Sequence, residues 1–344
     1  MTDLPSILDI SRDDLAETVA AWGEPAYRAN QIWQAVYRQF SPSAEGITGL
    51  PRALRHRLDE TFAFRQLEVR GEARSSDGQT IKIALARPGE ARAIEAVRMG
   101  YRRRTTLCIS TQAGCAMGCT FCATGQMGFA RQLSAGEIVE QVLVFAARER
   151  ISNIVFMGMG EPFHNYEATL EAVDRLNDPE GLAFGARRMT LSTVGLVPQI
   201  ERFTQERRQV NLAVSLHAAT DDLRDRLVPI NRKYPLDVLM EACRAYIQLT
   251  GRRLSFEWAL IRDVNDGEDQ ASALASRVRG LNCHVNLIPL NPTSGYPGEA
   301  SPRERAAAFR NVLTSRGVPC TVRVRRGLDI DAGCGQLAAK SSGQ

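Results

Sequence analysis

The chain has 344 residues, of which 44% are hydrophobic and 24% are charged, and its formal net charge is +4 at pH 7. This composition is that of an ordinary globular protein, and the length suggests about two domains. Apolar runs are too short for a membrane-spanning helix, and the N-terminus lacks the features of a secretory signal. We therefore expect a cytoplasmic protein with no membrane partner, whose eight cysteines serve metal or redox chemistry rather than structural disulfides.

The cations are almost all arginine, with forty arginines and three lysines. Guanidinium groups bind phosphate oxygens in pairs and stack on bases, so this bias is compatible with RNA binding. A general replacement of lysine by arginine explains the same bias equally well, and both explanations stay open at this point.

Residues 1–63 are predicted to form an N-terminal helical accessory domain. Ser11, followed by acidic residues, is typical of a helix N-terminus. Residues 27–37 carry apolar side chains at helical spacing, and Leu50 with the following proline begins a third helix. A small arginine-rich helical module is a candidate RNA-docking domain, although a domain that serves only for packing fits equally well.

Residues 64–104 are predicted to form a β-hairpin bridge. Strands are expected over 80–86 and 93–99, where apolar and polar residues alternate and a Pro-Gly pair lies between. Beyond this bridge, residues 105–338 alternate predicted strands with helices, and this alternation favours an α/β fold with a parallel sheet or barrel. Residues 339–344 are expected to be a disordered tail.

Three cysteines, Cys115, Cys119 and Cys122, form a C-x3-C-x2-C pattern directly after the first predicted strand of this region. Thiolates hold iron–sulfur clusters, and three ligands leave one iron of a four-iron cluster open for chemistry. A structural zinc site would need a fourth nearby ligand, and the nearest histidine, His164, lies far along the chain. Structural zinc and a metal-free loop are the lesser alternatives.

Polar or glycine residues follow the ends of successive predicted strands, where α/β barrels carry their functional residues. Each one alone is more typical of a turn or a cap, but their repetition favours a ligand site. These residues are Gly160 and Glu161, Ser192, Ser215 with Leu216 and His217, and Asn291.

Two further cysteines are candidates for chemistry. Cys334 stands between glycines in a loop that we expect to be exposed, where a thiolate is an available nucleophile. Cys108 ends the first strand of the α/β region. Cys243, Cys283 and Cys320 lie in helix or strand patterns and are interpreted as buried small hydrophobic residues.

In combination, five segments resemble the radical SAM adenine-C2 methyltransferases. They are GCAMGCTFCATGQMGF (114–129), FMGMGEP (156–162), SLHA (215–218), NLIPLNP (286–292) and AGCGQL (332–337). The resemblance implies a partial (β/α)6 radical SAM barrel with an N-terminal helical accessory domain.

The resemblance also implies a role for each candidate residue. Cys115, Cys119 and Cys122 would bind one 4Fe-4S cluster, and the strand-end residues would bind S-adenosylmethionine (SAM). Cys334 would carry the methyl group, Cys108 would form a disulfide with it, and Glu95 would accept the proton. The SAM contacts would be Gly160, Glu161, Ser192, Ser215, Leu216, His217 and Asn291.

The implied function is methylation of adenine C2 in 23S ribosomal RNA and in some transfer RNAs, with two SAM molecules used per turnover. A monomer and an electron donor such as flavodoxin are expected. An adenine-C8 methyltransferase of the antibiotic-resistance type shares the cluster and both cysteines, and is the nearest alternative. A non-enzymatic iron–sulfur protein that binds RNA or senses redox state is the alternative from another class, but it leaves Cys108 and Cys334 unexplained.

Overall fold

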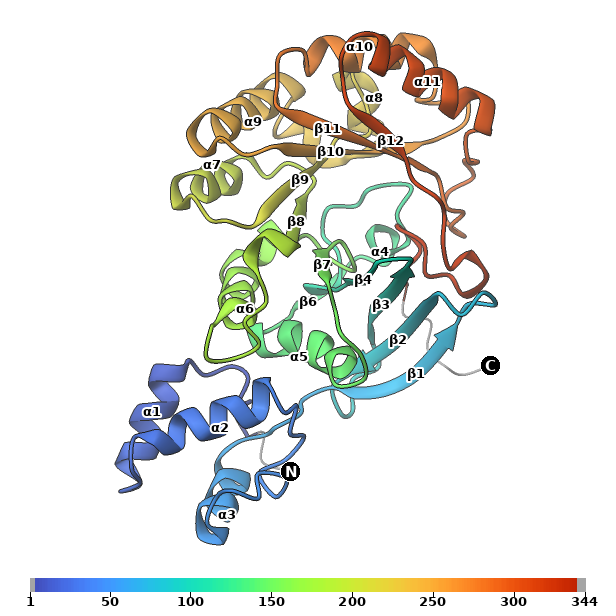
Figure 1. Cartoon of the computed structure of the whole chain (residues 1–344). Helices are drawn as coiled ribbons and strands as arrows, with labels where there is room; N and C mark the ends of the chain where they lie inside the picture. The colour runs from blue at the N-terminus through green and yellow to red at the C-terminus, as the bar shows by residue number, and fades with distance from the viewer. Residues whose placement is uncertain (1–3, 339–344) are drawn as a thin grey trace.

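The computed structural model describes residues 4–338, and the expected disordered tail at 339–344 lies outside them. The chain begins with three helices that stand at one end of the molecule (Figure 1). They are α1 (Arg12–Ala21), α2 (Tyr27–Tyr37) and α3 (Arg52–Thr61). The predicted helix start at Ser11 is confirmed, since the Ser11 hydroxyl caps α1 by accepting a hydrogen bond from the backbone N–H of Asp14 at 3.0 Å.

The larger part of the chain is built on a sheet with strand order β1-β2-β3-β4-β7-β8-β9-β10-β11-β12. The first four strands pair antiparallel, and all pairs from β4 onward are parallel. The expected α/β fold with an open, partial barrel is therefore confirmed. The strands are β1 (Glu68–Arg74), β2 (Thr80–Ala86), β3 (Ile94–Tyr101), β4 (Arg104–Cys108), β7 (Asn153–Phe156), β8 (Met189–Thr193), β9 (Asn211–Ser215), β10 (Leu254–Leu260), β11 (Cys283–Pro289) and β12 (Cys320–Val322).

The region expected to form a β-hairpin bridge contains one more strand than predicted. Strand β2 coincides with its prediction and β3 is shifted by one or two residues, but β1 precedes them, and all three extend the main sheet. Strand β1 gives no alternating apolar signal because none of its residues is buried. A small second sheet pairs β5 (Gln112–Gly114) with β6 (Phe129–Gln132) on either side of the cysteine loop.

Helices follow the parallel strands and cover the sheet. A capping box is present at the start of the helix over 135–146, since Ser134 and Glu137 exchange side-chain and backbone hydrogen bonds. Across residues 4–338, no helix is both long and apolar enough to cross a membrane. The helices that cover the sheet are α5 (Ala135–Ala146), α6 (Tyr166–Asn177), α7 (Val197–Glu206), α8 (Asp221–Leu227), α9 (Leu236–Thr250), α10 (Glu268–Arg277) and α11 (Arg303–Ser315). A short helix, α4 (Ala123–Gln126), follows the cysteine loop between β5 and β6.

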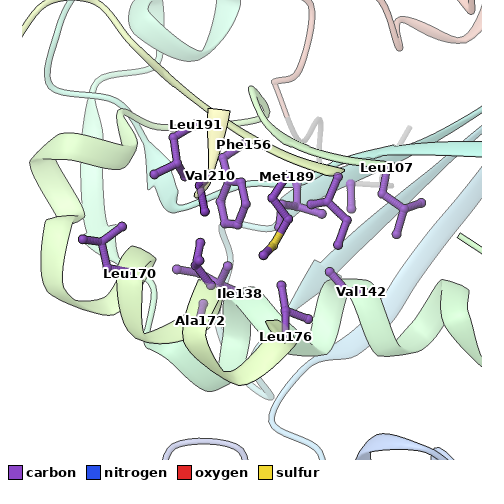
Figure 2. Close-up of a cluster of buried hydrophobic side chains, with 14 of the residues drawn as sticks. Leu107, Ile138, Val142, Phe156, Leu170, Ala172, Leu176, Met189, Leu191 and Val210 are labelled. Atoms are coloured by element: carbon purple, nitrogen blue, oxygen red, sulfur yellow. The ribbon is translucent and has the colours of Figure 1, made fainter. Parts of the chain in front are cut away.

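The main core lies between the sheet and its helices. Figure 2 shows Leu107, Phe156 and Met189 from β4, β7 and β8 against Ile138 of α5 and Leu176 of α6. Burial of such side chains is worth roughly 1.5–3 kcal/mol each and fixes the strand ends in place. The expectation for the remaining cysteines holds for Cys243 and Cys283, but Cys320 is only half-buried, because β12 is an edge strand.

Candidate active site

A cavity of about 220 Å³ lies at the carboxyl ends of the parallel strands. Most of the predicted site residues line it, although they come from segments far apart in the sequence. This is where open α/β sheets and barrels bind ligands. The predicted residues at the cavity wall are Cys108, Cys119, Cys122, Gly160, Glu161, Ser192, Ser215, His217, Asn291 and Cys334.

Three predicted site residues do not line the cavity. Cys115 is half-buried at the start of the cysteine loop, where its N–H donates to the Gly128 carbonyl at 3.1 Å. Leu216 is fully buried, and its N–H donates to the carbonyl of Glu257 at 3.0 Å. The side chain of Leu216 therefore does not contact the cavity, and Leu216 contributes only by holding the backbone between Ser215 and His217.

Glu95 lies on β3, two residues from Val97, which does line the cavity. Its carboxylate forms a 2.9 Å ion pair with Lys82 and accepts from the backbone N–H of Ala338 at 2.9 Å. Glu95 is 4% exposed, so both contacts are shielded from water. Its role as a proton acceptor stays a prediction.

The cysteine loop runs from the end of β5 to the start of α4 and is held by a separate hydrophobic cluster. Cys119 and Phe121 pack there against Leu223, Leu227 and other residues from α8 and the ends of β9, β10 and β11. The N–H of Thr120 donates to the Leu227 carbonyl at 3.0 Å. The loop is therefore fixed in place by apolar packing and by hydrogen bonds.

The donor set of this loop fits an iron–sulfur cluster. Burial raises the pKa of Cys115 to about 12 and that of Cys119 well above its usual range. Thiolates here need a positively charged partner, and iron supplies one. Within residues 4–338, no three His, Cys, Asp or Glu side chains converge closely enough for a single metal ion.

Glu161 is a buried carboxylate directly after Gly160. Its two oxygens accept from the N–H groups of Phe163 at 3.0 Å and Val194 at 2.8 Å. Burial nevertheless raises the pKa of Glu161 to about 7, so an ammonium group of a ligand would be stabilised beside it. Gly160 has φ of 98°, and a Cβ there would lie 2.5 Å from the Cβ of Gln112, so only glycine fits this turn.

His217 is held as a neutral donor. Its Nδ1 accepts from the N–H of Ala259 at 2.9 Å, and burial lowers its pKa to about 3, helped by Arg224. The proton therefore sits on Nε2. The backbone of His217 is left-handed, with φ of 63°. Its ring packs edge-on against the ring of Phe121, with 4.9 Å between the two ring centroids. This contact joins the end of β9 to the cysteine loop.

The segment 327–338, which we call the C-terminal strap, closes the cavity from the other side. Asn291 donates from Nδ2 to the Cys334 carbonyl at 2.9 Å, and its own Oδ1 is buried without a hydrogen-bond partner. Such an oxygen is costly unless a ligand donates to it. Asn291 thus orients the strap and keeps one acceptor for a ligand.

The strap is also tied to the cysteine loop and to the antiparallel strands. The N–H of Ala123 donates to the Gly335 carbonyl at 2.8 Å, and the Thr124 hydroxyl donates to the Leu337 carbonyl at 2.6 Å. Asp329 accepts from the N–H of Ser76 at 2.7 Å. These bonds place Cys334 beside Cys122, although the strap holds only one short 3-10 helix (Leu328–Ile330) and no strand.

Cys108 and Cys334 are both free thiols, and they face the same cavity. Burial and then the neighbouring Cys334 raise the pKa of Cys108 to about 12. Cys334 is exposed, as predicted, yet its crowded surroundings raise its pKa to about 11. The two thiols are neutral near pH 7 and close enough to influence one another.

Sequence reasoning missed Glu257, Arg323 and Phe121 at the cavity wall. Glu257 had a signal, because it is the only charged residue within the apolar strand β10. Arg323 and Phe121 are not distinguishable by pattern from other arginines and core aromatic residues.

Comparison with known proteins agrees with this geometry. Residues 6–63 match the family described as the ribosomal RNA large subunit methyltransferase N-terminal domain. Residues 109–274 match the radical SAM superfamily, which implies SAM and an iron–sulfur cluster.

Relatives and a solved structure match over nearly the whole length. A dual-specificity RNA methyltransferase RlmN of Myxococcus xanthus is 50% identical, covering 97% of this chain and 94% of the relative. A probable dual-specificity RNA methyltransferase RlmN of Chloroflexus aurantiacus is 49% identical, and the match covers 98% of this chain and 93% of the relative. The crystal structure of a radical SAM methyltransferase from Sphaerobacter thermophilus is 49% identical with a TM-score of 0.94, covering 98% of this chain and 100% of that one. The chain belongs to the RlmN family of radical SAM dual-specificity RNA methyltransferases.

Proposed function

We propose that this protein methylates C2 of an adenosine at the peptidyl-transferase centre of 23S rRNA and of an adenosine beside the anticodon of some tRNAs. Relatives of this length and identity are dual-specificity RNA methyltransferases. One structural observation carries the proposal: Cys108 and Cys334 line the same cavity as the cysteine loop and Glu161. A non-enzymatic iron–sulfur protein leaves unexplained why both thiols share a cavity with the buried carboxylate of Glu161.

The cavity divides into a cluster site and a SAM site. Cys115, Cys119 and Cys122 would hold a 4Fe-4S cluster. Glu161 would bind the SAM ammonium group, and the Nε2–H of His217 and Oδ1 of Asn291 would bind its polar atoms, with Gly160, Ser192, Ser215 and Leu216 shaping the site. When bound, the cluster and SAM supply a methyl group and a carbon radical that removes hydrogen from a methyl group.

Cys334 supplies the route by which an electron-poor carbon receives a methyl group. Its sulfur takes the methyl group of a first SAM and loses its proton. After a second SAM has been used to remove one hydrogen, the methylene carbon on sulfur bonds to adenine C2. The adduct carries an unpaired electron, which would return to the bound cluster while Glu95, the proposed acceptor, takes the C2 proton. Cys108 then loses its proton and attacks the Cys334 sulfur, so that a disulfide forms and the sulfur–carbon bond breaks toward the base. The methylene carbon takes up a proton to complete its methyl group.

The remaining parts of the chain support this chemistry in the proposal. Residues 1–63 would dock RNA, residues 64–104 would connect this domain to the barrel, and residues 105–338 would hold both cofactor sites and the strap. The protein would act as a monomer and receive electrons from a donor such as flavodoxin.

The experiment combines anaerobically reconstituted protein, SAM, a reductant and an RNA fragment of the peptidyl-transferase loop, with nucleosides identified by mass spectrometry. We expect 2-methyladenosine, its loss in Cys334→Ala, and its persistence in the control Cys320→Ala, whose cysteine lies on β12 away from the cavity. An 8-methyladenosine product would assign the chain to C8 chemistry. Unmodified RNA with intact SAM would refute the methyltransferase function.

A further inference from the structure

Glu257 is a buried carboxylate at the cavity that the chemistry above does not use. It lies on β10, is 3% exposed and contributes to the cavity wall. Its Oε1 accepts from Nδ2 of Asn286 at 2.8 Å, while its Oε2 is buried without a hydrogen-bond partner. A buried carboxylate oxygen without a donor is costly, so a donor from a ligand would be stabilising.

The strand register fixes the direction of this side chain. Glu257 pairs with Ser215 of β9 on one side and with Asn286 of β11 on the other. Side chains at paired positions of a parallel sheet lie on the same face. Because Ser215 lines the cavity, Glu257 points into the interior of the partial barrel, not toward the outer helices.

Two groups that bear on the reaction lie near this carboxylate. Cys334 is close enough that Glu257 contributes to its raised pKa. Arg323 approaches Oε1 to 3.8 Å, beyond hydrogen-bond distance, and its side chain is 43% exposed. Arg323 therefore leaves Oε2 without a hydrogen bond, in the same cavity that Cys334 lines.

Adenine offers a donor in the required place. Its Watson–Crick edge presents the exocyclic N6 amino group, then N1, then C2–H. A carboxylate oxygen that accepts from the amino group on C6 therefore places C2 on the same edge of the ring, just beyond N1. SAM has its own acidic partner in Glu161, beside the cysteine loop. Enzymes that modify bases read an extruded base by hydrogen bonds to this same edge.

Resting on the proposed function, we propose that Oε2 of Glu257 accepts a hydrogen bond from the N6 amino group of the target adenine and holds C2 against Cys334. Glu257 is then the residue that selects adenine. Guanine places a carbonyl oxygen where adenine carries the amino group, and this oxygen meets the carboxylate with repulsion instead of a hydrogen bond.

The test uses reconstituted holoenzyme and two RNA hairpins of the peptidyl-transferase loop, with adenosine or purine riboside, which lacks the amino group, at the target position. The wild type should prefer adenosine in kcat/KM by about tenfold to hundredfold, as expected for a hydrogen bond to a charged group. Glu257→Gln turns the free acceptor into an amide donor, and Glu257→Ala removes it. Both should reduce the preference to below about threefold.

Glu140→Gln is the matched control, because Glu140 is an equally buried carboxylate on α5 that accepts from the backbone of Gln66 and Leu67, away from the cavity. It should keep the wild-type preference. Iron content and SAM affinity, measured without RNA, should match the wild type in every variant.

Four results would overturn the inference. They are a wild type with no preference for adenosine, Glu257 variants that keep the preference, weaker SAM binding by these variants without RNA, and accumulation of a Cys334–RNA adduct. The third would assign Glu257 to SAM, and the fourth would assign it to removal of the C2 proton. A wild type that leaves the adenosine RNA unmodified refutes the proposed function itself, and this inference falls with it.

Discussion

The two ends of the cavity are built in different ways. At the cysteine-loop end, Cys119 and Phe121 sit in a hydrophobic cluster, and Glu161 and His217 follow regular strands. At the strap end, Cys334 lies in a loop that is held by hydrogen bonds, from Asn291 to its own carbonyl and from Ala123 to the carbonyl of Gly335. Apolar packing makes the first end rigid, whereas the second depends on individual bonds worth about 1 kcal/mol each. Substitutions should therefore separate SAM cleavage from methyl transfer.

The largest effect should come from Cys119→Ser. Loss of one of three thiolate ligands should reduce bound iron to near zero and abolish both SAM cleavage and RNA methylation. Iron analysis and SAM cleavage assays check this. The control is Cys243→Ser, which replaces a buried cysteine outside the cysteine loop and should leave the iron content of the protein unchanged. Full iron content in Cys119→Ser would mean that this cysteine is not a ligand.

Asn291→Ala should affect both ends at once. The substitution removes two groups: the buried Oδ1, which is proposed to bind SAM, and Nδ2, which donates to the Cys334 carbonyl. Because Oδ1 is lost, we expect SAM affinity to fall by roughly tenfold to hundredfold. S-methylation of Cys334, measured by peptide mass spectrometry at saturating SAM, should also slow. Normal S-methylation at saturating SAM would show that Asn291 does not orient the strap.

The cysteine-loop end should also respond to pH through Glu161. Because its pKa is raised to about 7, the carboxyl is protonated and neutral below pH 7 and attracts the SAM ammonium group only above it. The dissociation constant of SAM should rise about tenfold for each pH unit below 7. Calorimetry between pH 5.5 and 8 checks this, and Glu161→Gln should bind weakly with a flat profile. A flat wild-type profile would contradict the assignment.

The smallest effect should follow Asp329→Ala, which removes one exposed bond between the strap and Ser76. A loss of about 0.5–1.5 kcal/mol predicts a twofold to tenfold decrease in S-methylation of Cys334 with unchanged iron content. Asp237→Ala is the control, because Asp237 is an exposed aspartate on α9 that pairs with Arg277. If both variants slowed S-methylation of Cys334 equally, the bond between the strap and Ser76 would have no specific role in positioning Cys334.

The same contrast explains how far the sequence could predict this site. Cys115, Ser11 and the strand-end residues belong to local patterns, and the structure places most of them as expected. Cys334 and Asn291 were each recognised as site residues, but the hydrogen bond between them was not, because the strap has no periodicity and Asn291 and Ala123 are distant from it in sequence. Glu257 and Glu95 are both buried strand carboxylates, and only the tertiary structure shows that one is paired with Lys82 while the other keeps a free oxygen.

The position of the strap along the chain has a consequence for biosynthesis. Cys108 and the cysteine loop leave the ribosome long before Cys334, and domains generally begin to fold during synthesis. The barrel can thus acquire its packed loop while Cys334, the proposed methyl carrier, is still absent. Because the Ala123–Gly335 and Thr124–Leu337 bonds form last, the proposed methyl transfer would become possible only as a late step of maturation, after the proposed cluster site is in place.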